Sequence, residues 1–193
     1  MKSQRPFRAE RSERPFLLAT NLKANRRGKK MLSKEQVSVR RFKLSDLESV
    51  KDVIHKTIDI CYNGFYLKEV MDYFDMFHWD GNILKVARDG YTVVVEIQGK
   101  IVGTGSVMGD SVLRVFVDPA YQKQGLGKMI MNELETQAAA SGVKVVQLRA
   151  LAAARKFYES LGYVTVAKGL VEIDNGRHLE YYKMVKSLGV VEL

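Results

Sequence analysis

One continuous stretch, residues 115–134, constrains the fold of this chain more than any other. It continues an apolar run, residues 112–117, whose composition predicts a β-strand. Pro119 lacks a backbone donor and ends that strand. A turn that carries two glycines follows, and apolar residues then recur every four positions, as on one face of a helix. These residues are Leu126, Ile130, Leu134 and Ala138, with Met129 beside them. The predicted order is strand, glycine turn, helix.

The start of that helix has the chemistry of an anion-binding site. The first backbone N–H groups of a helix have no intrahelical acceptor, and the helix dipole is positive there. Phosphates bind such helix ends well. Gly125 and Gly127 carry no Cβ, so a ligand can approach the backbone closely, and Lys123 and Lys128 add positive charge. The alternative is an ordinary helix start, since the pattern is neither a Walker A loop nor a complete dinucleotide fingerprint.

Two segments resemble the motifs of one enzyme family. The pattern Gln122-x-x-Gly125-x-Gly127, after a strand that ends in Val-Asp-Pro, is similar to the Q/R-x-x-G-x-G/A motif of the GNAT N-acetyltransferases. Residues 154–163, ARKFYESLGY, resemble the A-x-x-F-Y-E-x-L-G-F/Y segment of the same family. The two segments have the order and separation found in that family. The resemblance covers residues 37–186.

The resemblance implies an acetyl-CoA-dependent N-acetyltransferase, which moves the acetyl group to a primary amine by direct attack. The implied cosubstrate is acetyl-CoA, and the acceptor is a small-molecule amine or the amine of a peptide or protein. Tyr158 matches the family tyrosine that donates to the departing sulfur, with core packing beside Phe157 as the alternative. The implied cofactor-binding residues are Val115, Phe116 and Val117 along the pantetheine arm, and Gln122, Lys123, Gln124, Gly125, Leu126, Gly127 and Lys128 around the diphosphate.

The sequence departs from the family pattern where the chemistry needs a base. Leu151 stands where the family commonly has an asparagine that contacts the cofactor, and Gln147 is the nearest match to a catalytic glutamate of some members. Asp110 and Glu96 are the remaining candidate bases, with structural or solvated roles as their alternative. A non-catalytic acyl-CoA-binding module is the competing interpretation, because it would keep the cofactor residues and lack a base.

The positive charge of the chain is concentrated at its N-terminal end. The net charge is +9, but residues 1–36 hold 11 Lys and Arg against 3 Asp and Glu, whereas the rest holds 20 against 19. We therefore expect residues 1–36 to form a basic, disordered tail and residues 37–193 to form one GNAT-like domain. Nucleic-acid binding through the tail is the alternative to a solvated tail.

Other features bound the compartment and the partners. The single cysteine, Cys61, excludes an internal disulfide and fits a reducing, cytoplasmic location. No apolar run approaches the roughly 18 residues that a membrane span needs. His55, His78 and His178 lack metal-ligand spacing, so we expect no metal and place them in the core or on the surface. The sequence does not decide whether the chain is a monomer or a homodimer.

The remaining periodicities predict a mixed α/β fold, with a mostly antiparallel sheet of six to seven strands flanked by about four helices. Helices are expected from a Ser45–Glu48 capping box onward, over residues 67–77, after Gly125, and over residues 154–161. Strands are expected at residues 37–42, 91–97, 100–108, 111–117, 143–148, 163–173 and 178–185. The strands at 111–117 and 143–148 should be parallel, because a helix crosses between them.

Residues 57–79 are rich in aromatic and acidic side chains. In the resembling family this region helps to form the acceptor site, and aromatic walls with carboxylates would suit a cationic amine. The alternative is that the rings pack the helices on the sheet while the acids face water. The rings are Tyr62, Phe65, Tyr66, Tyr73, Phe74, Phe77 and Trp79, and the acids are Asp59, Glu69, Asp72 and Asp75.

Overall fold

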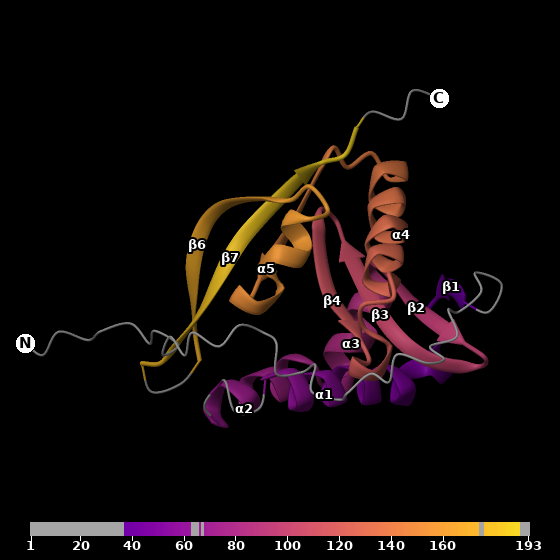
Figure 1. Cartoon of the computed structure of the whole chain (residues 1–193), viewed down its shortest axis with the longest axis horizontal. Coiled ribbons are helices and arrows are strands. Elements are labelled where there is room, and N and C mark those ends of the chain that lie inside the picture. The colour runs from indigo at the N-terminus through magenta and orange to yellow at the C-terminus, as the bar shows by residue number, and fades with distance from the viewer. Residues whose placement is uncertain (1–36, 63–65, 67, 174–175, 190–193) are drawn as a thin grey trace, which may run out of the picture.

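A seven-stranded sheet runs through the molecule, and helices cover both of its faces (Figure 1). The structure is a computed structural model that describes residues 37–62, 66, 68–173 and 176–189. Residues 1–36, where the sequence predicts a basic tail, lie outside the described residues. The strands are β1 (Val37–Arg41), β2 (Tyr91–Ile97), β3 (Lys100–Met108), β4 (Ser111–Val117), β5 (Val145–Ala150), β6 (Val164–Glu172) and β7 (His178–Ser187). The helices are α1 (Leu47–Tyr62), α2 (Lys68–Phe77), α3 (Asp80–Asp89), α4 (Leu126–Ala140) and α5 (Ala152–Glu159), with short 3-10 helices η3 (Leu44–Asp46) and η4 (Pro119–Tyr121).

The strand order in the sheet is β1-β2-β3-β4-β5-β7-β6. Every neighbouring pair is antiparallel except β4 and β5, which are parallel and joined by α4. The predicted mixed, mostly antiparallel sheet and its parallel pair are therefore confirmed. The described part of the chain contains five α-helices rather than about four, since the sequence analysis does not predict α3.

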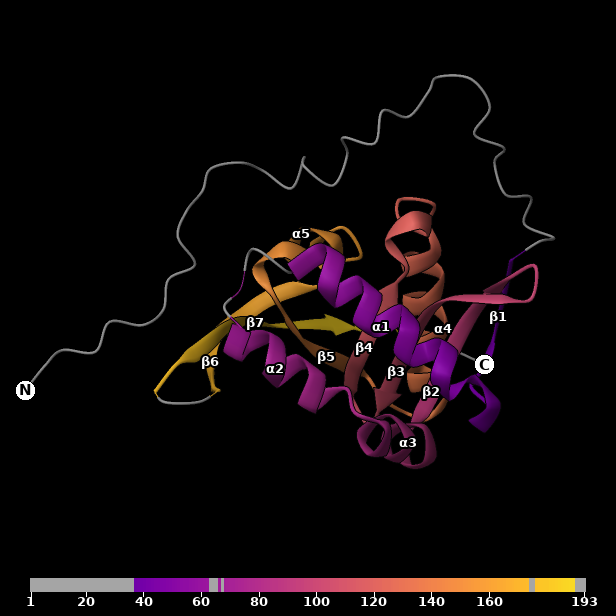
Figure 2. The same ribbon diagram turned by 90° about the horizontal axis from the view of Figure 1, so that it is seen from below.

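The two faces of the sheet carry separate cores. Helices α1, α2 and α3 cover one face, which Figure 2 shows from their side, and α4 and α5 cover the other. Along β2, Val93 and Val95 pack toward α4 whereas Val94 packs toward α1, as the two-residue period of a strand requires. The predicted apolar face of α4 is buried, but Met129 is 37% exposed and Met131 fills the core in its place.

A β-bulge interrupts β4 at the centre of the sheet. Phe116 pairs with Thr104 and Leu113 pairs with Ser106, so two residues of β4, Arg114 and Val115, oppose a single residue of β3. Arg114 has a φ of 53°, a left-handed conformation that L-residues adopt rarely. Beyond the bulge, the two parallel strands are no longer paired: the one residue pair recorded between β4 and β5 within the described chain is Ser111↔Gln147.

Local turn chemistry agrees with the sequence at one site and differs at another. Gln98 and Gly99 separate the strands expected at residues 91–97 and 100–108, and they form a hairpin turn with φ values of 51° and 78° that suit the right-handed twist of the strands. The predicted Ser45–Glu48 capping box is wrong. Asp46 caps this segment instead, because it accepts a 2.7 Å hydrogen bond from the Lys43 backbone N–H and a second from Arg40.

Among the helices described, none combines the length and the apolar character that crossing a bilayer requires.

Candidate active site

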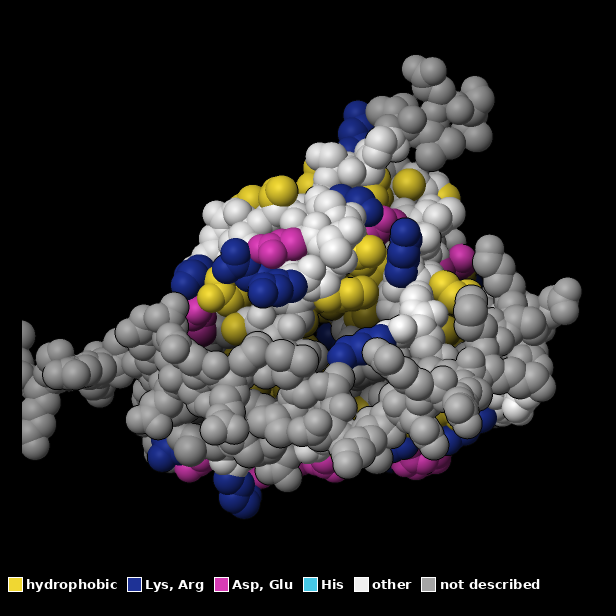
Figure 3. All heavy atoms as spheres, viewed as in Figure 1, with side chains coloured by type: hydrophobic (Ala, Val, Ile, Leu, Met, Phe, Trp, Pro, Cys, Tyr) yellow, Lys and Arg dark blue, Asp and Glu magenta, His cyan; other side chains and the backbone are white. Residues whose placement is uncertain are grey.

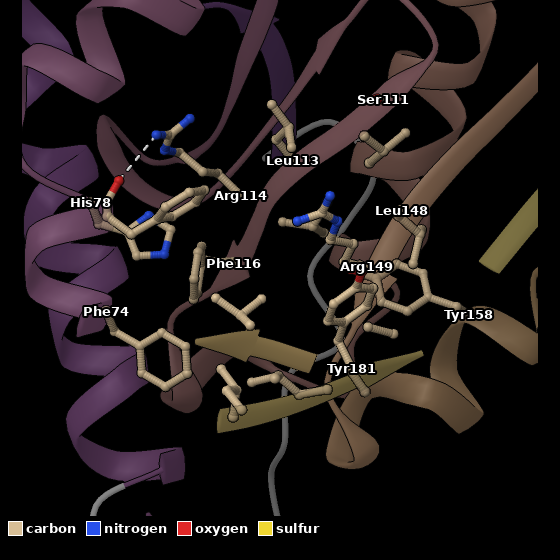
Figure 4. A pocket seen from close by; sticks show the side chains of 18 of the residues that line it. Phe74, His78, Ser111, Leu113, Arg114, Phe116, Leu148, Arg149, Tyr158 and Tyr181 are labelled. Carbon is tan, nitrogen blue, oxygen red and sulfur yellow. Dashed lines mark hydrogen bonds between the residues drawn. The ribbon is translucent and has the colours of Figure 1, made fainter. Parts of the chain in front are cut away.

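A cavity of about 550 Å³ opens where β4 and β5 separate (Figure 4). One wall is the bulged part of β4, and the opposite wall is β5 with the start of α5. Helix α2 and the residue after it close one end, and β7 closes another. In Figure 3 the molecule is hollowed between the positions of α5 and α4, with hydrophobic side chains inside and Lys or Arg side chains at the edge.

Tyr158 lies on α5 and lines the cavity, where sequence reasoning expects a proton donor. Its ring packs edge-on against Phe157 and Tyr163, with centroids 5.1 and 5.8 Å away. Burial raises the pKa of the phenol above its ordinary value, so the hydroxyl stays protonated at neutral pH. Within the described chain, no hydrogen-bond partner is recorded for that hydroxyl, and it can therefore donate to a ligand.

The glycine turn presents unpaired backbone donors at the start of α4. The first helical hydrogen bond runs from the Met129 N–H to the Gly125 carbonyl, so the three preceding N–H groups have no intrahelical acceptor. Gly125 has a φ of 84°, and nothing lies within 4 Å of the position that a Cβ would take. The turn therefore combines three N–H groups without intrahelical acceptors with open space beside Gly125, two features that suit an anion.

Gly127 and Gln122 also stabilise the structure around this turn. A Cβ on Gly127 would lie 3.0 Å from Cζ of Phe157, so this glycine lets α4 approach α5. The Gln122 side-chain amide donates to the Val117 carbonyl at 3.0 Å and reaches Cys61 Sγ at 3.8 Å. Gln122 thereby connects the turn to the end of β4 by a hydrogen bond.

The three β4 residues expected along the pantetheine arm divide into two groups. Val115 and Phe116 line the cavity, whereas Val117 does not. All three are partly buried and follow the bulge, where β4 is not paired with β5. No residue of β5 pairs with them in the described chain, although the Val117 carbonyl already accepts from Gln122, so the stretch from Val115 to Phe116 is the part left open to an extended ligand.

Residues 57–79 fit the acceptor-site interpretation in part and the packing interpretation in part. Tyr62, Tyr73, Phe74 and Phe77 line the cavity, as an acceptor site would require. Trp79 is 59% exposed, and Phe65 lies outside the described residues. The four acids do not line this cavity: Asp72 pairs with Lys68, Glu69 pairs with Arg177, and Asp59 and Asp75 are exposed.

The two candidate bases also lie outside the cavity lining. Glu96 pairs with Arg40 at 2.8 Å on the β1–β2 side of the sheet. Asp110 accepts hydrogen bonds from Gln147 Nε2 at 2.8 Å and from Ser111 Oγ at 3.0 Å, and these bonds lower the pKa of its carboxyl. A carboxylate held in this way is a weak base.

Sequence reasoning missed two cavity residues, Arg114 and His78. Arg114 donates from Nη2 to the Phe77 carbonyl at 3.2 Å, while its Nε and Nη1 atoms are buried without a partner. Burial lowers the pKa of the guanidinium. His78 is 6% exposed, its ring packs edge-on against Phe116, and burial lowers its pKa to about 3. His78 is therefore neutral at pH 7 and a poor base.

Comparison with known proteins identifies the family. The acetyltransferase (GNAT) domain model matches residues 88–165 of this chain. The N-terminal acetyltransferase B complex catalytic subunit NAA20 of Arabidopsis thaliana is 33% identical over 135 residues, which cover 66% of this chain and 72% of that protein. The chain belongs to the GNAT acetyltransferase family. The family, fold class and acetyltransferase class that the two sequence motifs imply are thereby confirmed.

Solved GNAT structures share this fold over nearly their whole length. A GCN5-related N-acetyltransferase from Rhodopseudomonas palustris superposes with a TM-score of 0.72 at 24% identity, and covers 78% of this chain and 95% of its own. PaiA N-acetyltransferase from Thermoplasma acidophilum, solved in complex with coenzyme A, gives a TM-score of 0.63 at 16% identity over 79% of this chain and 99% of its own. At these identities the likeness shows that the GNAT fold is shared.

Proposed function

We propose that this GNAT chain moves an acetyl group from acetyl-CoA to a primary amine by direct attack, in the cavity where β4 and β5 separate. The observation that carries the proposal is the separation itself. Parallel pairing stops after Ser111↔Gln147, and the gap is lined by Tyr158 on one side and the bulged β4 on the other. An extended thioester can enter such a gap along the strand.

The cosubstrate would be held by backbone groups more than by side chains. The N–H groups of Leu126, Gly127 and Lys128 have no intrahelical acceptor and would suit a diphosphate. The exposed side chains of Lys123 and Lys128 add positive charge there. The pantetheine arm would follow β4 from Phe116 to Val117, and Leu151, in place of the usual asparagine, supplies only apolar contact.

Acetyl transfer forms a C–N bond and breaks a C–S bond, so a proton must leave nitrogen and one must reach sulfur. Tyr158 would supply the proton to sulfur, because its phenol stays protonated in the buried wall. A thiol has an ordinary pKa of about 8.5, which is below that of the phenol, so Tyr158 would stabilise the departing thiolate by donating a hydrogen bond, and a proton passed to sulfur would be restored to the tyrosine from water.

The proton on the amine would leave through water. Within the described part of the chain, no Asp or Glu lines the cavity, and His78 is neutral with a pKa of about 3. An ordinary amine with a pKa near 10 is neutral in about 0.1% of molecules at pH 7. The rate should therefore rise with pH as the neutral fraction of the acceptor rises.

The acceptor class is a small-molecule amine or the amine of a peptide or protein, and the reducing cytoplasm is the compartment we propose. The experiment is a thiol-release assay with acetyl-CoA against a panel of polyamines, amino acids, antibiotics and peptide N-termini. Turnover of any acceptor supports the proposal. Tight CoA binding without turnover of any acceptor would support a non-catalytic acyl-CoA-binding module instead.

A further inference from the structure

The chain that joins β4 to α4, residues 118–125, is held in place by α1; we call it the β4–α4 segment. Helix α1 crosses β3 and β4 on the face of the sheet that Figure 2 shows. Lys56 Nζ on this helix donates to Asp118 Oδ2 at 2.8 Å, and Cys61 Sγ accepts from Gln122 Nε2 at 3.8 Å. Helix α1 therefore supports the segment that leads to the start of α4, where the diphosphate is proposed to bind.

Asp118 is the first residue of the β4–α4 segment and is 2% exposed. Its Oδ1 atom accepts a hydrogen bond from the Ala120 N–H at 2.9 Å and so caps η4. The Asp118 backbone N–H donates to the Val102 carbonyl on β3 at 2.9 Å, and the Asp118 carbonyl accepts from the Tyr121 N–H at 2.8 Å. These bonds fix the point at which the chain turns away from the sheet after β4.

Lys56 supplies the opposite charge for this buried carboxylate. Burial acts to raise the pKa of Asp118, but hydrogen bonds from Lys56 and from the Ala120 N–H outweigh burial and lower that pKa, so the carboxylate is charged at neutral pH. The Lys56 side chain is 45% exposed, whereas that of Asp118 is 3% exposed. Removal of the lysine alone would leave a buried charge without its ion pair, which is costlier than removal of both charges.

Neither member of this ion pair lies at the cavity. Lys56 and Asp118 line a separate hollow between α1 and the turn that joins β2 to β3, and they are not among the described residues that line the cavity with Tyr158. Asp118 is too buried to bind a ligand itself. An effect of Asp118 on acetyl-CoA must therefore be passed on through the β4–α4 segment.

We propose that Asp118 and Lys56 are positioning residues for the cosubstrate. They hold the β4–α4 segment so that the N–H groups at the start of α4 keep the orientation that binds the diphosphate. The proposal rests on the proposed placement of acetyl-CoA at those groups. Because Tyr158, the residue proposed for the chemistry, lies on α5, loss of the pair should raise the KM for acetyl-CoA and the Kd for CoA. The kcat at saturating acetyl-CoA should stay near that of the parent.

Calorimetric titration of CoA into the full chain tests the proposal without an acceptor. Asp118→Ala removes the cap and the ion pair and should raise the Kd for CoA roughly 10-fold or more, whereas Asp118→Asn keeps an acceptor for the Ala120 N–H and should raise it less. Lys51→Met is the matched control, because the 3.0 Å ion pair of Lys51 with Asp80 joins α1 to α3 instead. The control should keep the Kd of the parent. An unchanged Kd in both Asp118 variants overturns the proposal, whereas failure of the parent to bind CoA would overturn the proposed acetyl transfer.

A double-mutant cycle separates positioning from direct contact between Lys56 and CoA, and provides the test if Asp118→Ala does not fold. Lys56→Met alone should weaken CoA binding, and Lys56→Arg, which keeps the charge, should retain it. In the Asp118→Asn background the buried charge is gone, so Lys56→Met should cause no further loss. A loss that persists there would show that Lys56 contacts CoA directly and would overturn the positioning role.

Kinetics with any acceptor that is turned over give a second measurement. The Asp118 and Lys56 variants should raise the KM for acetyl-CoA and keep kcat, because the proposed pair acts on binding and not on the chemical step. A lower kcat with an unchanged KM would overturn the proposal.

Discussion

Gly127 lies against the ring of Phe157, and a Cβ added to the glycine would meet Cζ of that ring at 3.0 Å. This contact joins the turn that would hold the diphosphate to α5, the helix that carries Tyr158. The glycine is therefore needed for the packing of two helices as well as for access to the backbone. A substitution at Gly127 should therefore also disturb α5, the helix that carries Tyr158.

Gly127→Ala should lower the free energy of unfolding by roughly 1–2 kcal/mol, because the added methyl group overpacks the contact with Phe157. In a Phe157→Leu background the same change should be nearly neutral, since alanine favours the helix and the ring is gone. Urea denaturation of the four proteins measures this coupling. Additive effects of the two substitutions would contradict the contact.

Tyr158→Phe keeps the ring and removes the hydroxyl. If the phenol donates to sulfur, kcat should fall by roughly 10²–10⁴ while CoA affinity and melting temperature barely change. If the hydroxyl only stabilises the fold, stability should drop by about 1–3 kcal/mol with kcat largely kept. Tyr163→Phe is the control, because that buried tyrosine does not line the cavity. An unchanged kcat removes Tyr158 from the mechanism.

Lys128→Glu should weaken CoA binding by roughly 3- to 10-fold at low salt, with the difference shrinking as salt rises. The side chain is exposed at the first turn of α4, so the fold should tolerate the charge reversal. Lys144→Glu, which places the same charge change beyond the other end of α4, is the matched control. Calorimetric titration measures both, and equal losses would place the diphosphate elsewhere.

His78→Phe should make the protein less sensitive to acid. Burial lowers the pKa of His78 from 6.5 to about 3. Between these pH values the unfolded chain binds a proton that the folded chain does not, so acidification favours unfolding. The variant lacks this contribution and should lose less stability between pH 7 and pH 4. Denaturation at several pH values provides the comparison, and parallel profiles would show that His78 does not contribute.

A shortened chain that begins at Ser33 should fold and bind CoA as the full chain does. The reason is the sequence of residues 1–36, which carries most of the net charge and little apolar periodicity. Melting temperature and CoA affinity of the two chains give the comparison. A loss of either would place part of that segment within the domain.

The sequence predicts the centre of the sheet well because its signals are local. β2, β3 and β4 begin and end at the residues expected from their composition, 91–97, 100–108 and 111–117. Helix α3 escapes prediction because only Ile83 and Val86 are buried in it, and Gly81 and Asn82 are weak helix formers. The capping residue is missed because Arg40, which binds Asp46, lies on another element.

The sequence predicts only part of the candidate site, because some of its residues come together only through folding. The glycine turn and Tyr158 belong to contiguous motifs, which a single segment can reveal. Arg114 and His78 are 36 positions apart and meet only because α1, α2 and α3 fold over the bulged strand. Nothing in the run VLRVF signals a left-handed residue, so an alternating strand is the natural expectation there.

The extra residue in β4 divides the strand into two segments, and the alternation of side chains between the two faces of the sheet shifts by one residue between them. Before the bulge, side chains alternate in one register against β3, and after it they alternate in the other. Substitutions in the segment before the bulge should therefore change the cavity lining without altering the backbone after it, where the thioester is proposed to lie. A single extra residue thus lets the two segments of one strand be altered independently of each other.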